Sequence, residues 1–224
     1  MIEKNHNGKT KSGSRFPDPR VAWDDGLLCI GGGLSVPVLV DAYSHGIFPW
    51  PFGEDAPIPW FSPPQRGVIE FDSIHIPRRL AQFMRNMKWT TTIDRDFAGV
   101  IRGCAAQPRG GTWITRAMIN GYVALHRAGH AHSIECWNGE DLVGGIYGVF
   151  VGNVFSAESM FFKESNASKV CLVRLVEHLA SLGLTWLDIE VVTLTTEKFG
   201  GRLIPREDFM KRLKTARHFP PKKF

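Results

Sequence analysis

The sequence predicts an α+β protein in which a small N-terminal domain precedes a larger domain with a mixed β-sheet flanked by helices. Two observations indicate this class. A segment rich in proline and aromatic residues, 46–64, separates the first helical pattern from the rest of the chain. Three strand-like runs then lie between 132 and 162, followed by a helical pattern and one more strand. Strands in that order with helices are typical of a sheet covered by helices.

The first part of the chain contains one clear helix. We expect residues 1–14 to be a disordered lead, because they are polar and carry no apolar periodicity. A small domain should occupy 15–64, with a helix over 36–45 that Ser35 caps and Gly46 ends. The prolines in the following segment exclude a helix and favour a rigid loop that displays aromatic rings. The domain boundary is expected near Gln65.

The second domain, 65–216, begins with a strand over 68–71. Helices are expected over 78–87, 96–104, 116–128 (capped by Thr115) and 168–182, and strands over 132–137, 142–151, 154–162 and 185–192. The dipeptides Asn138-Gly139 and Gly152-Asn153 tolerate positive φ, so the three middle strands should form a meander of hairpins. Residues 217–224, rich in Pro and Lys, are expected to be a flexible tail.

Composition excludes several classes of protein. No apolar run approaches the ~18 residues of a membrane-spanning helix, and the N-terminus lacks the apolar core of a secretory signal. The four cysteines lie far apart with no zinc-ligand spacing, which favours reduced cysteines, a cytoplasmic location and no metal site. The formal net charge of +5 is compatible with a polyanionic partner without identifying one. The absence of an apolar heptad pattern favours a monomer.

Two segments suggest nucleic-acid binding. Rings such as Trp50, Trp60 and Phe61 in the proline-rich segment either stack on bases or fill a core. The helix over 78–87 and the residue after it carry a group of cations that either contacts phosphates or is simply solvated: Arg78, Arg79, Arg85 and Lys88.

Three acidic residues are candidates for catalysis. Glu158 lies in an otherwise apolar strand, where a carboxylate needs a partner or a chemical role. Asp188 and Glu190 are two residues apart on a strand, so they should share one face, and the like charge should raise the pKa of one of them. Two acids on a solvated edge would be the alternative.

The segment 110–115 precedes a helix N-terminus, which either binds an anion or is a plain cap. No P-loop, Ser–His–Asp arrangement or acyl-CoA signature is present.

Many short motifs together resemble the bacterial leucyl/phenylalanyl-tRNA–protein transferases. The matching runs include Phe16-Pro17-Asp18-Pro19, Gly31-Gly32-Gly33-Leu34-Ser35, Tyr43-Ser44-His45-Gly46-Ile47-Phe48-Pro49-Trp50, Gly111-Thr112-Trp113-Ile114-Thr115, Tyr122-Val123-Ala124-Leu125-His126-Arg127, Glu158-Ser159-Met160-Phe161 and Ile204-Pro205-Arg206. They are collinear from Phe16 to about Leu213.

The resemblance implies a GNAT-like second domain and transfer of leucine or phenylalanine, with methionine also tolerated, from aminoacyl-tRNA to proteins that begin with Arg or Lys. No cofactor is implied, because the ester is already activated. Trp50 and Trp113 would hold the terminal adenosine, and Glu158 would anchor its sugar or the nearby backbone. An apolar pocket for the amino acid would be lined by Ile146, Phe155 and Met160. The cations from Arg78 to Lys88 would contact the tRNA.

The chain departs from the family at the acidic strand. Asp188 matches, but Ile189 and Glu190 replace the usual Cys and Gln. We hypothesise that Glu190 acts directly as the base, with its basicity raised by Asp188. The pair could also bind a basic side chain or alter acceptor specificity, and a tRNA- or N-terminus-binding module without turnover remains an alternative.

Overall fold

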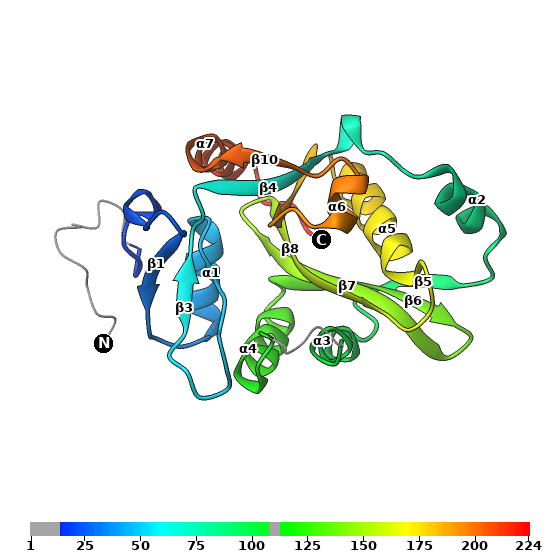
Figure 1. Ribbon diagram of the computed structural model, residues 1–224, viewed down its shortest axis with the longest axis horizontal. Coiled ribbons are helices and arrows are strands. Elements are labelled where there is room, and N and C mark those ends of the chain that lie inside the picture. Colours follow the sequence, from blue (N-terminus) through cyan, green and yellow to red (C-terminus); the bar gives the residue numbers. More distant parts are fainter. Residues whose placement is uncertain (1–13, 108–112) are drawn as a thin grey trace.

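The computed structural model describes residues 14–107 and 113–224, which form two β-sheets with helices around them (Figure 1). The smaller sheet has the order β1-β3-β2, with β1 (Leu27–Ile30), β2 (Phe48–Pro49) and β3 (Pro59–Phe61). It lies beside α1 (Val36–Ser44), and a short 3-10 turn, η1 (Pro19–Val21), precedes it. The proline-rich segment is therefore not entirely loop, since it supplies two short antiparallel strands.

The larger sheet has seven strands in the order β10-β4-β9-β8-β7-β6-β5. The strands are β4 (Gln65–Glu70), β5 (Thr90–Ile93), β6 (Ala131–Asn138), β7 (Asp141–Val151), β8 (Val154–Phe162), β9 (Trp186–Glu190) and β10 (Arg202–Pro205). Only the β8–β9 pair is parallel, and the other pairs are antiparallel. The predicted α+β class with a mixed sheet flanked by helices is confirmed.

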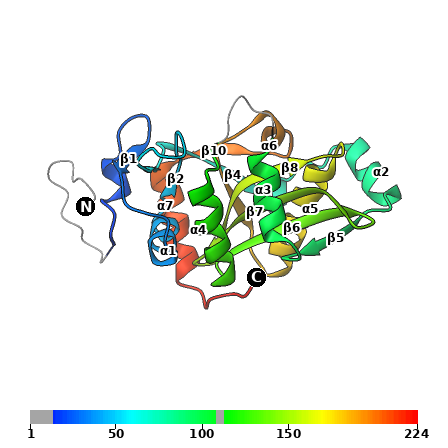
Figure 2. The same ribbon diagram turned by 90° about the horizontal axis from the view of Figure 1, so that it is seen from below.

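Helices cover both faces of this sheet. On one side lie α3 (Phe97–Ala105) and α4 (Arg116–Arg127), and on the other lies α5 (Ala167–Ser181) (Figures 1 and 2). The remaining elements are η2 (Phe71–Ser73), α2 (Arg78–Asn86), α6 (Leu194–Lys198) and α7 (Arg206–Arg217). The Thr115 side chain caps α4 as expected by accepting from Met118 N at 3.2 Å. Ser35 precedes α1, but its side chain makes no capping bond.

The predicted meander is present. Strands β6, β7 and β8 pair in sequence, and Gly152 and Asn153 both have φ near +60°, as the tight turn of a hairpin requires. Besides β2 and β3, the sequence analysis did not predict β1, β5, α6, β10 and α7, which complete the fold.

One buried apolar cluster runs from the N-terminal sheet into the larger domain. Trp60 and Leu39 belong to it, together with Ile101 of α3, Tyr122 of α4 and Tyr147 of β7. A second cluster lies between the other face of the sheet and α5. Because the first cluster crosses from one sheet to the other, burial of apolar surface holds the small sheet against α3 and α4.

The C-terminal segment, expected to be a flexible tail, lies against the sheet. The Asn153 side chain donates to the carbonyls of Phe219 and Pro220 and accepts from Lys222 N at 2.8 Å. Phe224 stacks on His132 with ring centroids 4.2 Å apart. The ring of Phe224 therefore packs against the protein, although the polar composition of residues 217–224 predicts no such packing.

Two expectations concern residues in or near the gaps. The proposed lead, 1–14, lies outside the described residues except for Ser14, which donates to Asp41. The glycines and threonine of 110–112 also lie outside them. Within the described ranges, no helix combines the length and apolar character needed to cross a bilayer.

Candidate active site

The parallel strands β8 and β9 separate to open a cavity. They are paired only at Ser156 and Asp188. Beyond this pair, a cavity of about 390 Å³ lies between the end of β8 and the segment that follows β9. Its lining is Ile146, Ala157, Glu158, Ser159, Met160, Leu172, Ile189, Val191, Thr193, Thr195 and Thr196. Its volume lies within the range of small-ligand sites.

A β-bulge directs Glu158 away from the apolar part of the cavity. Gly148 of β7 faces Ala157 while Tyr147 faces Ser159, so Glu158 has no partner in the ladder. Its carboxylate accepts from the hydroxyls of Tyr43 on α1, at 2.5 Å, and Tyr122 on α4, at 3.1 Å. Bulges re-aim side chains in this way near functional sites. Glu158 therefore has the partners that a carboxylate among apolar neighbours requires.

Burial governs the protonation of this cluster. It raises the pKa of Glu158 to about 7, although hydrogen bonds from Tyr43 and Tyr122 act in the opposite direction. Burial, followed by the charge of Glu158, also raises the pKa of both tyrosines well above the usual value. The tyrosines are therefore donors at neutral pH, whereas Glu158 exchanges its proton there.

Asp188 is fully buried and fully partnered. Arg66 of β4 donates to its two carboxylate oxygens at 2.8 and 2.7 Å, and the Ser156 hydroxyl donates at 2.7 Å. The Arg66 guanidinium also lies over the rings of Phe48, at 4.5 Å, and Phe209, at 4.7 Å. A bidentate pair of this kind holds both planes in a fixed orientation. The Asp188 carboxylate is thus held in a fixed ion pair and is not a free acid.

Glu190 ends β9 in an unusual backbone conformation. Its φ is +57°, a region that costs a non-glycine residue on the order of 1–3 kcal/mol. Its side chain is buried, 3.5 Å from Arg66 Nη2, and its backbone N–H donates to Asp188 at 3.0 Å. Burial, and then the nearby charge of Glu158, raises the pKa of Glu190 well above the ordinary value.

Asp188 does raise the pKa of Glu190, as expected, but it is not the largest cause. The hypothesis made Asp188 the cause of a raised basicity at Glu190. Burial and Glu158 are the larger causes, and Arg66 acts against them more strongly than Asp188 acts with them. The reason is that Arg66 pairs with Asp188 directly and offsets much of its charge. The two acids do approach the same guanidinium, as their spacing on one strand predicts.

The aromatic residues of the N-terminal domain divide into two groups. Trp60 is fully buried and donates to Gly31 O, so it fills the core. Trp50 is 36% exposed and lies 5.8 Å from Trp113, between ring centroids, at an angle of 38°. Phe48 contacts both Trp50 and Arg66, so the tryptophan pair is one ring away from the buried acidic cluster. The pair offers an exposed aromatic surface next to the site.

The predicted apolar lining is placed partly as expected. Ile146 and Met160 face each other across β7 and β8 and line the cavity. Phe155 does not line it. Its side chain is fully buried and stacks on Phe224 at 5.3 Å. It precedes Ser156, where β8 is still paired with β9, and the cavity opens only after that point.

The four predicted RNA-contacting cations, Arg78, Arg79, Arg85 and Lys88, lie on or just after α2. All are exposed, and the ion pairs found over 14–107 and 113–224 involve none of them. The charge of this face is therefore not offset by neighbouring carboxylates.

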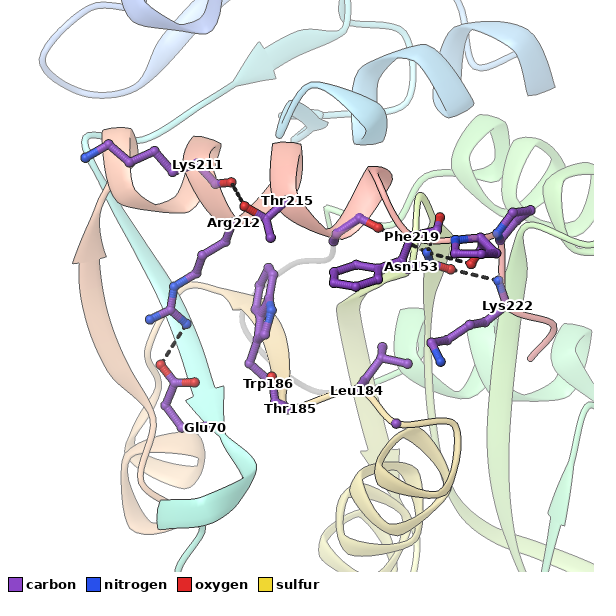
Figure 3. Close-up of a pocket in the computed structure, with 14 residues that line it drawn as sticks. Glu70, Asn153, Leu184, Thr185, Trp186, Lys211, Arg212, Thr215, Phe219 and Lys222 are labelled. Atoms are coloured by element: carbon purple, nitrogen blue, oxygen red, sulfur yellow. Dashed lines mark hydrogen bonds and ion pairs between the residues drawn. The ribbon is translucent and has the colours of Figure 1, made fainter.

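A larger cavity, about 820 Å³, lies at the other end of β9 beneath α7 and the C-terminal segment (Figure 3). Arg212 crosses its wall, donating to Glu70 at 2.7 Å with its guanidinium 5.7 Å from the Trp186 ring. None of the predicted site residues lines it.

Within 14–107 and 113–224, one group of side chains has ligand atoms close enough for a metal ion: Asp94, His126 and His132. Hydrogen bonds already use much of this group. Nδ1 of His132 lies 2.7 Å from Asp94, and Nδ1 of His126 lies 2.8 Å from the carbonyl of Ala131. His126 lies on α4 one turn from Tyr122, but no hydrogen bond or ion pair of the described residues joins this cluster to Glu158, Asp188 or Glu190, and we assign it a structural role.

Sequence reasoning missed Arg66, Tyr43, Tyr122 and Ser156. Both tyrosines lie within the motifs that carry the family resemblance, each on the buried face of a helix. A hydroxyl group on a buried face needs a hydrogen-bond partner, and this requirement could have indicated a polar site. Arg66 immediately precedes the apolar run of β4, where a charge must find a partner. Its partner comes from β9, which only the fold reveals.

The family described as leucyl/phenylalanyl-tRNA protein transferase matches residues 68–214, and its N-terminal domain matches residues 32–64. The chain belongs to this family. It is therefore an aminoacyltransferase.

Curated relatives extend the match over most of the chain. A leucyl/phenylalanyl-tRNA–protein transferase of Anaeromyxobacter sp. (strain Fw109-5) is 48% identical over 204 residues, covering 90% of this chain and 86% of the relative. That of Solidesulfovibrio magneticus is 46% identical, covering 90% and 83%. That of Pseudomonas syringae pv. syringae is 48% identical, covering 83% and 81%. The family match includes both the aromatic pair region and the acidic strand.

Proposed function

We propose that this protein transfers leucine or phenylalanine, with methionine also tolerated, from aminoacyl-tRNA to the N-terminal Arg or Lys of acceptor proteins and so marks them for degradation. The observation that supports this best is the placement of the buried acids Glu158 and Glu190 beside an apolar cavity, with Trp50 and the partly buried Trp113 one ring away from the acidic cluster. Family membership gives the reaction class, and this arrangement accounts for its chemistry.

Each part of the donor has a matching surface. The exposed face of Trp50, backed by Trp113, provides stacking for the terminal adenine, worth ~1–3 kcal/mol per base. The apolar side chain enters the cavity between Ile146 and Met160. A pocket of this kind selects by shape and desolvation, so it accepts Leu, Phe and Met and excludes charged side chains.

The reaction is aminolysis of an ester. The neutral α-amine of the acceptor attacks the ester carbonyl, a C–N bond forms, and the C–O bond to the ribose breaks. The amine proton passes to Glu190, and Glu190 returns it to the ribose oxygen, which leaves as a hydroxyl. Glu190 suits this step because burial has raised its pKa, which makes the ionised carboxylate a stronger base. Alignment of amine and carbonyl supplies further acceleration.

The acidic cluster also suits the acceptor. A side chain of Arg or Lys is attracted to the carboxylates Glu158 and Glu190, and Arg66 cannot neutralise both because Asp188 engages it at two oxygens. Acceptors with an uncharged first residue lack this attraction.

The deciding experiment combines the purified protein with radiolabelled leucyl-tRNA and a model peptide that begins with Arg. We expect label in the peptide, none when the first residue is Asp, and none when the donor is uncharged tRNA plus free leucine. Bound tRNA without labelled peptide would contradict the proposal and identify a binding module instead.

A further inference from the structure

A separate cavity with a strongly cationic lining lies between α2, the start of α5 and α6. Its volume is about 560 Å³, and it is lined by Pro77, Arg79, Leu80, Asn166, Lys169, Thr195, Lys198 and Phe199. The lining contains three cations and no carboxylate. A concave surface with one sign of charge concentrates counter-ions, so its natural ligand is an anion.

The cations of this cavity lack acidic partners. Among the ion pairs of the described chain, none includes Arg79, Lys169 or Lys198. Lys169 is half-buried as a residue, and its ammonium group donates to the neutral side chain of Asn166 at 3.3 Å. Like charges that line one cavity repel each other, and a bound anion relieves that repulsion.

The start of α5 adds to the positive potential. Its first turn contains no acidic residue, and the side chain of Asn166, which has φ of +74°, makes no capping bond. The helix is 15 residues long, so its dipole end contributes a partial positive charge to the same cavity.

This cavity and the candidate active site meet at α6. Thr195 lines both, and Phe199, at the end of α6, forms part of the cationic cavity. A ligand chain that leaves the active-site cavity over α6 therefore passes directly to the three cations. Arg79 belongs to the exposed basic face of α2, so the positive surface continues from the cavity onto that helix.

We propose that this cavity binds a phosphodiester of the single-stranded 3′ end of the aminoacyl-tRNA, with Lys169 and Lys198 as the main contacts. This inference rests on the proposed function, because the RNA whose terminal ester lies at Glu190 carries one negative charge at each nucleotide linkage. Cations fix the path of such a strand without reading its bases.

The test measures fluorescence anisotropy with uncharged tRNA at several salt concentrations. The variant K169Q/K198Q should bind about tenfold more weakly, and its slope of log affinity against log salt should fall by about 1, since ~0.7 is lost per single-strand phosphate contact. K169R/K198R keeps the charges and should bind like the wild type. K214Q, which removes an exposed charge from α7, is the matched control and should change neither quantity.

A tRNA without its three 3′-terminal nucleotides locates the contact. Trimming should weaken binding by the wild type but change little for K169Q/K198Q, because both changes remove the same interaction. If K169Q/K198Q loses the same affinity for full-length and for trimmed tRNA, the inference is overturned. It is also overturned if this variant has the thermal midpoint of the wild type and binds full-length tRNA with unchanged affinity.

The proposed function fails separately. If the wild type transfers leucine to peptide but K169Q/K198Q binds tRNA normally, only the inference falls. If the variant loses binding to the 3′ end while the wild type makes no peptide product, the phosphodiester site stands and the transfer reaction falls.

Discussion

Glu190 combines a carboxylate, burial and a left-handed backbone in one residue. The sequence places it two residues after Asp188, and that spacing correctly brings both acids to one guanidinium. The backbone conformation and the approach to Glu158 are tertiary features, because they depend on where β9 ends and where β8 bulges. A strained residue held by its surroundings is a feature of functional sites.

The base role of Glu190 gives the first prediction. Replacing it with Gln should lower the rate of transfer at saturating substrates about 100-fold, since general-base catalysis contributes roughly 10²–10⁴-fold. The wild-type rate should rise with pH, because the active form is the ionised carboxylate and its pKa is raised, and the variant should lose this dependence. The measurement is single-turnover peptide formation between pH 5 and 9.

Glu197→Gln, an exposed change on α6, serves as the control and should leave the rate unchanged. Transfer by Glu190→Gln at or above the wild-type rate would show that no carboxylate is needed at this position.

Glu158 gives a prediction about stability. Its folded pKa of about 7 exceeds the ordinary 4.5, so the folded state binds this proton more tightly than the unfolded state does. The stabilising contribution is complete below about pH 4.5 and is lost as pH rises through 7. Glu158→Gln cannot titrate, and its amide oxygen can accept from one tyrosine hydroxyl while its NH2 group donates to the other. Its stability relative to the wild type should therefore increase from pH 5 to pH 8, by about 1–3 kcal/mol.

Urea unfolding of both proteins at pH 5, 6, 7 and 8 measures this difference. A stability difference that stays constant over the whole series would show that Glu158 has an ordinary pKa in the folded protein.

At the level of elements, Arg66 joins parts of the chain that are far apart. Its guanidinium on β4 pairs with Asp188 on β9 and lies over Phe48 of β2 and Phe209 of α7. Arg66→Met removes the counter-charge and leaves the Asp188 carboxylate buried without it. We expect a loss of about 3–5 kcal/mol in the free energy of unfolding, as for other broken buried ion pairs. Chemical denaturation at pH 7 is the measurement.

Arg202→Met is the matched control. Arg202 pairs with Glu70 at the surface, where Arg212 also contacts the same carboxylate, so we expect a loss below about 1 kcal/mol. If both variants lose the same free energy of unfolding, the buried Arg66–Asp188 pair stabilises the fold no more than the surface pair does.

The elements that sequence predicts best are those with strong local signals. The helix 116–127 has an apolar face, a Thr cap and a following glycine, and the hairpin at Gly152-Asn153 has a turn that few other residues allow. The elements missed are short or lack such signals. Strands β5 and β10 have four residues each and lie at the two edges of the sheet, and α7 is largely polar with few buried residues. Their stability comes from partners distant in sequence.

The same distinction applies to the site. Glu158 and the Asp188–Glu190 pair stand out because carboxylates among apolar residues are locally anomalous. The prediction that Phe155 lines the cavity was wrong, because residue type and strand face do not indicate where along β8 this strand separates from β9. Arg66 was missed because an arginine before a strand is unremarkable until β9 is known to lie beside it.

At the scale of the whole molecule, positive charge is distributed unevenly with respect to the site. The α2 cations are exposed without acidic partners, whereas Lys211 on α7 pairs with Asp208. Helices α2 and α7 lie at opposite ends of the large sheet (Figure 1). If the tRNA approaches along α2, the position of the charges matters more than the net charge of +5.

Two double variants with the same change in net charge separate these effects. R78Q/R85Q on α2 should weaken binding of uncharged tRNA about tenfold and make the salt dependence shallower by about 2, at ~0.9 per duplex phosphate contact. K211Q/K214Q on α7 should change neither quantity. Peptide formation at saturating tRNA should be unchanged in both, because these side chains lie away from Glu190. Equal weakening by the two variants would show that tRNA responds to overall charge and that α2 is not a docking surface, and the predicted direction of tRNA approach would then be wrong.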